Sequence, residues 1–325
     1  MTPVSSELVE MLTNAAKPDL PEWLSEIYPF RTRLVDLGQY RMSLVDEGPQ
    51  DAPALLLLHG NPTWSFMYRD LIRRARERFR VIAPDTIGFG LSDKPQDENY
   101  HTLARHIENL GALVDQLRLP RLTLVAHGWG GPIGLGYAVA RPDTISRLVL
   151  CNTWALPVAN SSRRRLPLAM RIANSGRVGR FLDSLLGLSM ESAIASRTHR
   201  RLSDWVLEGY RYPFPNLTSR VASRAFTRMF FEDANPAQRT MAEVYDQLKN
   251  VTAPATILFG ELDPVLSRLS AYLIRDALRG AREPQFIPEA SHLLPEDAPD
   301  VLAEAVMREE RLPPKSADNL FRILS

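Results

Sequence analysis

The chain has 325 residues, of which 45% are hydrophobic and 24% are charged, and its formal net charge is +1 at pH 7. This length and composition allow one large buried core plus an inserted subdomain, and they exclude a disordered or fibrous protein. The small net charge provides no field that would gather nucleic acid or an anionic membrane surface. We find no secretory leader and no apolar run of the roughly 18 residues that a membrane span needs, so we expect a cytoplasmic protein with a small-molecule substrate.

Short apolar runs alternate with longer amphipathic stretches along the first half of the chain, a pattern typical of an α/β fold. A helical arm is predicted at residues 6–16, followed by an antiparallel pair of strands near residues 33–37 and 40–46. Units of strand, loop and helix then recur, and their continuous apolar runs predict a parallel sheet that is covered on both faces. These strands are expected at residues 54–59, 79–84, 122–126 and 146–151.

The strand pattern is absent between about residues 155 and 240, where Arg, Leu, Ala and Met recur at helical spacing with breaks at prolines. We interpret this segment as a helical cap inserted into the core. The sheet resumes with strands at residues 255–259 and 285–287, and a loosely packed tail is expected from residue 313. The predicted organisation is a first core part at 1–154, a cap at 155–240 and a second core part at 241–325.

The single cysteine, Cys151, cannot form an intrachain disulfide, and its place in the apolar run RLVLCN favours a buried small side chain over a nucleophile. Arginines cluster within residues 163–165 and 197–201, and both clusters are interpreted as solvated helix faces. His101 and His106 are five positions apart, which fits no helical ligand pair, so we expect both at the surface. The sequence has no phosphate-binding loop, zinc-like Cys/His spacing or dinucleotide fingerprint, so we expect no metal or cofactor.

The segment VAHGWGGPIG predicts a strand through Ala126, a sharp turn at Gly128 and a helix from about Trp129. The glycines at 130 and 131 would let the helix and the strand approach closely. This is the architecture of a nucleophile elbow. A strand-to-helix turn with glycines is common in α/β proteins, however, so the neighbouring motifs must decide its meaning.

A candidate acid and base follow the last two predicted strands. Asp263 lies in FGELDPVL, and His292 lies in EASHLLPEDAP. Taken singly, each residue is more often part of a surface loop or turn. Because adjacent parallel strands end at the same edge of a sheet, the two together indicate a carboxylate that orients an imidazole.

Five segments resemble those of haloalkane dehalogenases across nearly the whole core: HGNPTWSFMYRDLI, APDTIGFGLSDKP, WGGPIG, FGELDP and ASHLLPEDAP. Within that group, the segments YPF, VDEGP and NTWA are similar to the branch that includes the β-lactone decarboxylases of olefin synthesis. The resemblance implies the α/β-hydrolase fold, with a mostly parallel eight-stranded sheet flanked by helices and an inserted helical cap. It also implies catalysis without cofactor or metal.

The resemblance carries over to individual residues. It implies His292 as general base and Asp263 as its acid, because the CNTW segment, where some dehalogenases place that acid, contains none. Asn61 and Trp129 match the leaving-group site, where side-chain N–H groups would hold a halide and backbone N–H groups an oxyanion. The alternative is a turn residue before Pro62 and a helix-start aromatic packed under the cap.

One residue departs from the family pattern. In such enzymes an elbow aspartate attacks carbon, and His-activated water then hydrolyses the ester, but here that position is Gly128. Three hypotheses compete for a chain that resembles hydrolases of small apolar electrophiles such as a haloalkane, epoxide, ester or β-lactone. It is a variant inactivated at its nucleophile, a hydrolase in which His292 activates a water that attacks directly, or a non-catalytic protein that binds or senses a small ligand. Retention of the paired acid and base favours the two enzyme hypotheses, and the oligomeric state stays open.

Overall fold

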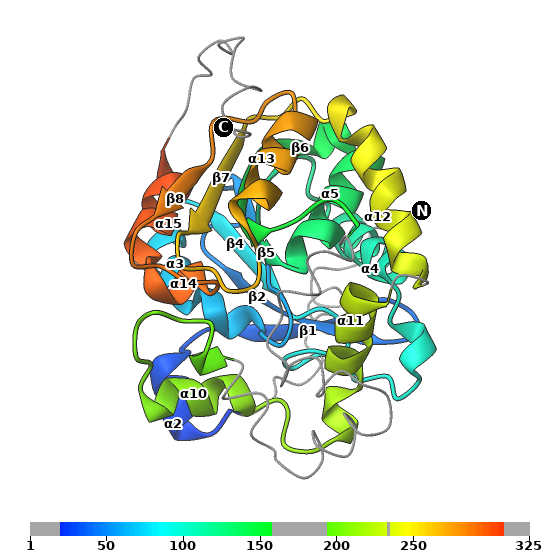
Figure 1. Cartoon of the computed structure of the whole chain (residues 1–325). Helices are drawn as coiled ribbons and strands as arrows, with labels where there is room; N and C mark the ends of the chain where they lie inside the picture. Colours follow the sequence, from blue (N-terminus) through cyan, green and yellow to red (C-terminus); the bar gives the residue numbers. More distant parts are fainter. Residues whose placement is uncertain (1–19, 158–193, 233–234, 309–325) are drawn as a thin grey trace.

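The structure, a computed structural model, describes residues 20–157, 194–232 and 235–308. An eight-stranded sheet lies at its centre in the order β1-β2-β4-β3-β5-β6-β7-β8 (Figure 1). β2 pairs antiparallel with both β1 and β4, and all other neighbouring strands are parallel. The predicted α/β fold with a mostly parallel eight-stranded sheet is confirmed.

All eight predicted strands are present, with limits that differ from the prediction by no more than two residues. The side chains of β3 are buried along its whole length, because helices cover both faces of the sheet. The strands are β1 (Thr32–Asp36), β2 (Arg41–Glu47), β3 (Ala54–Leu58), β4 (Arg80–Pro84), β5 (Leu122–Gly128), β6 (Ile145–Thr153), β7 (Ala255–Gly260) and β8 (Gln285–Ile287).

Helices pack on the two sides of this sheet. α4, α5 and α12 contact one another on one side, whereas α3 and α15 pack together on the other (Figure 1). The longest of them, α4, begins after Thr102, whose hydroxyl accepts a hydrogen bond from the backbone N–H of Arg105. The core helices are α3 (Arg69–Ala75), α4 (Leu103–Gln116), α5 (Gly130–Ala140), α12 (Pro236–Gln247), α13 (Arg268–Ala277), α14 (Leu294–Asp297) and α15 (Pro299–Met307). No helix of the described ranges is both long and apolar enough to cross a membrane.

The described part of the predicted cap contains α10 (Asp204–Arg211), the short 3₁₀ helix η4 (Thr218–Arg220), α11 (Val221–Phe231) and the first residues of α12, and no strand. α10 lies beside α2 (Glu22–Ile27), at the end of the molecule opposite α13 (Figure 1). The predicted cap limit at residue 240 falls inside α12, which packs on α4 and α5. The helical arm expected at 6–16, the arginines at 163–165 and the tail from 313 lie outside the described residues.

The prediction that two histidines lie at the surface is wrong. His101 and His106 are only 2% and 1% exposed, and their rings stack with centroids 5.7 Å apart. Burial lowers the pKa of both imidazoles, so each packs as a neutral aromatic ring, and His106 contacts Phe226 of the cap. Cys151 is fully buried, as expected, and burial raises its pKa.

Candidate active site

The elbow is formed where β5 ends at Gly128 and α5 begins at Gly130. Gly128 has φ +52°, a left-handed conformation that glycine adopts without steric cost. Its carbonyl accepts a hydrogen bond of 2.6 Å from the hydroxyl of Thr153, at the end of the neighbouring strand. A Cβ at Gly130 would lie 2.3 Å from the carbonyl oxygen of Leu58, so only glycine permits this approach of helix and strand.

The space beside Gly128 is bounded by two other candidate segments. A Cβ built on Gly128 would lie 3.3 Å from Cα of Gly60 and 4.0 Å from Nε2 of His292. A side chain at this position would therefore project between the loop after β3 and the imidazole. The elbow has the geometry that would present a nucleophile to His292, although residue 128 supplies none.

The structure brings His292 and Asp263 together, as the sequence predicts. Nδ1 of His292 lies 2.9 Å from Oδ2 of Asp263, and the two side chains are 7% and 2% exposed. The other carboxylate oxygen accepts hydrogen bonds from the backbone N–H groups of Val265 and Leu266, at 2.7 and 3.0 Å. Burial raises the pKa of Asp263, but the charge and hydrogen bond of His292, together with the other hydrogen bonds, outweigh burial and lower it overall. Asp263 is therefore ionised and can hold Nδ1–H of His292, which leaves Nε2 as the proton acceptor.

Asn152 completes this pair, and the sequence reasoning missed it. It lies near the end of β6 with φ +40°, and its Nδ2 donates a hydrogen bond of 2.7 Å to Oδ2 of Asp263. Its Oδ1 accepts a hydrogen bond of 3.2 Å from the backbone N–H of Gly260. The signal that could have identified it is its position at the carboxyl edge of the sheet, on the strand that pairs with β7.

His127 supports the backbone of the loop that contains His292. Its Nε2 donates a hydrogen bond of 2.8 Å to the backbone carbonyl of His292. Burial, aided by the neighbouring charge of His292, lowers the pKa of His127 to about 3. The side chain is therefore neutral at physiological pH and positions the loop rather than exchanging protons.

Asn61 is bonded to the cap through its side chain. Its Nδ2 donates to the carbonyl of Ser223 and to the hydroxyl of Thr227, both on α11, at 3.2 and 3.3 Å. Its Oδ1 is buried and has no hydrogen-bond partner. Because the amide donor is engaged with α11, this arrangement can hold a leaving group only if the contact with the cap is exchanged for it.

Trp129 follows the elbow and is almost completely buried, with 5% of its surface exposed. No described residue accepts a hydrogen bond from its backbone N–H or from that of Asn61. Both amides therefore remain available beside Gly128, as an oxyanion site requires. The indole packs edge-on against three aromatic rings, Trp154, Phe226 and Phe230, with centroids 5.0, 5.1 and 6.5 Å away.

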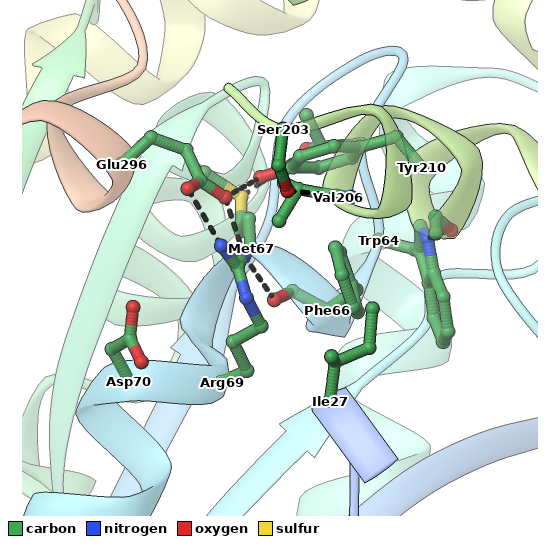
Figure 2. A network of polar contacts seen from close by, with 12 residues as sticks. Ile27, Trp64, Phe66, Met67, Arg69, Asp70, Ser203, Val206, Tyr210 and Glu296 are labelled. Atoms are coloured by element: carbon green, nitrogen blue, oxygen red, sulfur yellow. Dashed lines mark hydrogen bonds and ion pairs between the residues drawn. The ribbon is translucent and has the colours of Figure 1, made fainter. Parts of the chain in front are cut away.

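A buried polar network connects the cap to the helix that follows His292 (Figure 2). Arg69 of α3 donates two hydrogen bonds to the carboxylate of Glu296 on α14, at 2.5 and 2.8 Å, and a third to the carbonyl of Phe66. The hydroxyl of Tyr210 on α10 donates a hydrogen bond to the same carboxylate. The ion pair is nearly inaccessible, with 9% and 3% of the two side chains exposed. One carboxylate on α14 thus connects α3 with α10, a few residues after His292.

Comparison with known proteins agrees with this fold. The family model for the alpha/beta hydrolase fold matches residues 53–299. A haloalkane dehalogenase of Mycobacterium marinum is 36% identical over 287 residues, which cover 86% of this chain and 94% of that protein. The solved structure of the tetrameric haloalkane dehalogenase DpaA from Paraglaciecola agarilytica has a TM-score of 0.76 and 27% identity, covering 89% of this chain and 97% of that one.

A second kind of relative also matches. The cis-3-alkyl-4-alkyloxetan-2-one decarboxylase of Shewanella oneidensis is 33% identical over 286 residues, which cover 85% of this chain and 87% of that protein. The oxetan-2-one ring in its name is a β-lactone. Fold and sequence thus define an α/β hydrolase. The chain belongs to that enzyme family, among the haloalkane dehalogenases and their relatives, and the resemblance found in its motifs is confirmed.

Proposed function

We propose that this chain hydrolyses a small apolar electrophile by direct attack of a water that His292 activates. The observation that carries the proposal is the intact His292–Asp263 pair, whose Nε2 faces the place where a side chain at residue 128 would lie. An acid and a base held this closely have no evident use in a protein that only binds a ligand. The relatives named for haloalkanes and for an oxetan-2-one indicate the size and chemistry of the substrate.

In this mechanism each residue has a defined role. Asp263 holds Nδ1–H of His292, so Nε2 accepts a proton from the water as its oxygen attacks the electrophilic carbon. With an ester or a β-lactone, the carbonyl oxygen becomes an oxyanion, which the backbone N–H groups of Asn61 and Trp129 would stabilise. His292 then returns the proton to the leaving oxygen. Gly128 leaves space for about one water beside Nε2.

Two alternative functions are also compatible with the geometry of the site. A parent protein with aspartate at position 128 would use the family's covalent chemistry, and the 4.0 Å between a Cβ there and Nε2 of His292 suits that arrangement. A non-catalytic binder would use the same enclosed edge to hold a small ligand. The covalent enzyme requires a carboxylate at position 128 for turnover, whereas the binder turns over nothing with or without it.

The test is a turnover assay of this chain and of its Gly128→Asp and His292→Gln variants on haloalkanes, epoxides, esters and β-lactones, with products followed by mass spectrometry. Exposed His199 offers a matched control, His199→Gln. Direct water attack requires turnover by the Gly128 chain that His292→Gln abolishes and His199→Gln preserves. Turnover by the Gly128→Asp variant alone would identify a chain inactivated at its nucleophile. Absence of turnover by both the unaltered chain and the Gly128→Asp variant would favour the non-catalytic binder.

Isotope labelling sharpens the distinction. In a single turnover in H₂¹⁸O, direct attack places ¹⁸O in the product. The covalent route of the Gly128→Asp variant would instead place the label in the carboxylate at position 128, because the product takes its oxygen from that carboxylate. An unlabelled first product from the Gly128 chain would contradict direct attack.

A further inference from the structure

Arg197 reaches the catalytic edge, which corrects its interpretation as part of a solvated helix face. Arg200 and Arg201 are exposed as expected, but Arg197 is half-buried. Its Nη1 donates a hydrogen bond of 3.3 Å to the backbone carbonyl of Asn61. Its own carbonyl accepts a hydrogen bond of 2.9 Å from the backbone N–H of Leu293, next to the candidate base. The residue thus lies between the loop that contains Asn61 and the loop that contains His292.

The guanidinium of Arg197 is incompletely satisfied. Its Nε is buried without a hydrogen-bond partner, and within the described residues it forms no ion pair with a carboxylate. Burial lowers the pKa of Arg197 and the nearby carboxylate of Asp263 raises it, but an arginine remains charged in either case. In contrast, the buried Arg69 has its charge matched by Glu296 through two hydrogen bonds.

The unused edge of Arg197 is the edge with which arginines of this protein hold carboxylates. Arg80 binds Asp46 through Nε and Nη2, at 3.0 and 2.8 Å. Arg41 binds Asp93 with the same pair of nitrogens. In Arg197 the Asn61 carbonyl occupies Nη1, and no described residue accepts from Nε or Nη2.

We propose that Arg197 binds the carboxylate that hydrolysis forms, so that the substrate class of this site is an ester or β-lactone rather than a haloalkane. The proposal deepens the function proposed above and rests on it. A planar guanidinium edge forms two parallel hydrogen bonds with the two oxygens of a carboxylate, whereas a halide offers a single acceptor atom to both N–H groups. Nη1 of Arg197 contacts the carbonyl of Asn61, the residue whose own backbone N–H would hold the carbonyl oxygen of the substrate.

Hydrolysis of the ester or β-lactone proceeds by addition of water followed by elimination of the alkoxy oxygen. Water adds to the carbonyl carbon as His292 takes one of its protons, and the tetrahedral oxyanion collapses with cleavage of the bond to the alkoxy oxygen. That oxygen receives the proton from His292. The acid product then releases its remaining proton to solvent and pairs with Arg197 as a carboxylate.

The test is a binding measurement with two probes of nearly equal shape, pentanoate and pentanamide, on the full chain and on Arg197→Gln, Arg197→Lys and Arg200→Gln. Isothermal titration calorimetry gives each Kd, and thermal unfolding verifies that each variant is folded. We expect Arg197→Gln to weaken pentanoate at least tenfold, Arg197→Lys to weaken it less, and Arg200→Gln to leave it unchanged. Pentanamide should bind equally to all four proteins.

Several results would overturn the proposal. Equal pentanoate affinity with and without Arg197, failure of the unaltered chain to bind pentanoate, or tighter binding of bromide than of pentanoate would each exclude a carboxylate site. If Arg197→Gln does not fold, the comparison with Arg197→Lys decides. Because binding needs no turnover, pentanoate held by Arg197 in a chain that hydrolyses nothing would refute the proposed hydrolysis and retain the carboxylate site.

Discussion

The two sides of the candidate site differ in how completely they are built. On the side of β7 and β8, Asp263 accepts four hydrogen bonds, from His292, Asn152, Val265 and Leu266. On the elbow side, residue 128 has no side chain, Oδ1 of Asn61 has no partner and two backbone amides have no described acceptor. The base is thus held by contacts that do not involve the nucleophile position, so its geometry can persist when that position changes.

The two sides of the site also differ in their free-energy costs. A buried carboxylate and imidazole are tolerated only when their hydrogen bonds are made, which explains the dense network around Asp263. The elbow instead requires a left-handed backbone, which costs other residues about 1–3 kcal/mol and glycine little. The loop that contains His292 is therefore ordered by its polar contacts, while the elbow is unstrained because residue 128 is a glycine.

The largest expected effect comes from removing the carboxylate of Glu296, which binds Arg69 and Tyr210 (Figure 2). Glu296→Ala leaves the buried charge of Arg69 without its partner, so we expect the free energy of unfolding to fall by about 3–5 kcal/mol. Urea unfolding measures it, with Glu243→Ala, at an exposed position of α12, as the control. Tyr210→Phe removes a single hydrogen bond and should cost about 1–2 kcal/mol. A fall no larger for Glu296→Ala than for Glu243→Ala would show that the network does not anchor the loop.

An intermediate effect is expected on the pH dependence of the free energy of unfolding, through His127. The pKa of His127 is lowered to about 3, so between pH 6.5 and 3 the unfolded chain binds a proton that the folded chain does not. The contribution of His127 to the free energy of unfolding is therefore complete above pH 6.5. It is lost as the pH falls toward 3, by a few kcal/mol in all. We expect His127→Gln to flatten the pH dependence of urea unfolding over this range. An unchanged slope would mean that other buried histidines, such as His106, dominate it.

The smallest expected effect probes the elbow. Gly128→Ala places a Cβ 3.3 Å from Cα of Gly60 on a left-handed backbone, and should lower the free energy of unfolding by about 1–2 kcal/mol. The control is Gly111→Ala in α4, where a Cβ meets nothing within 4 Å and helix propensity predicts a gain of about 0.5–1 kcal/mol. A Gly128→Ala variant as stable as the unaltered chain would show that the elbow is not strained.

Much of the fold and part of the site could be predicted because the signals are local. A continuous apolar run such as that of β3 already identifies a strand buried on both faces. Gly128, Asp263 and His292 could be found because each lies at the end of a strand or in the loop that follows one, and the carboxyl ends of parallel strands meet at one edge. Asn61 and Trp129 were indicated by the resemblance to haloalkane dehalogenases rather than by this rule.

The remaining features depend on which segments meet, and no local pattern encodes that. Asn152 contacts Asp263 across 111 positions of the chain, Arg197 contacts Asn61 across 136, and Arg69 contacts Glu296 across 227. A polar residue such as Arg197 has the same local pattern on a solvated face as in a buried site, because only its distant neighbours change its solvation and its partners. The sequence alone determined the strands, the elbow and the pairing of Asp263 with His292, whereas packing of distant segments against one another decided which polar groups have a hydrogen-bond partner and which have none.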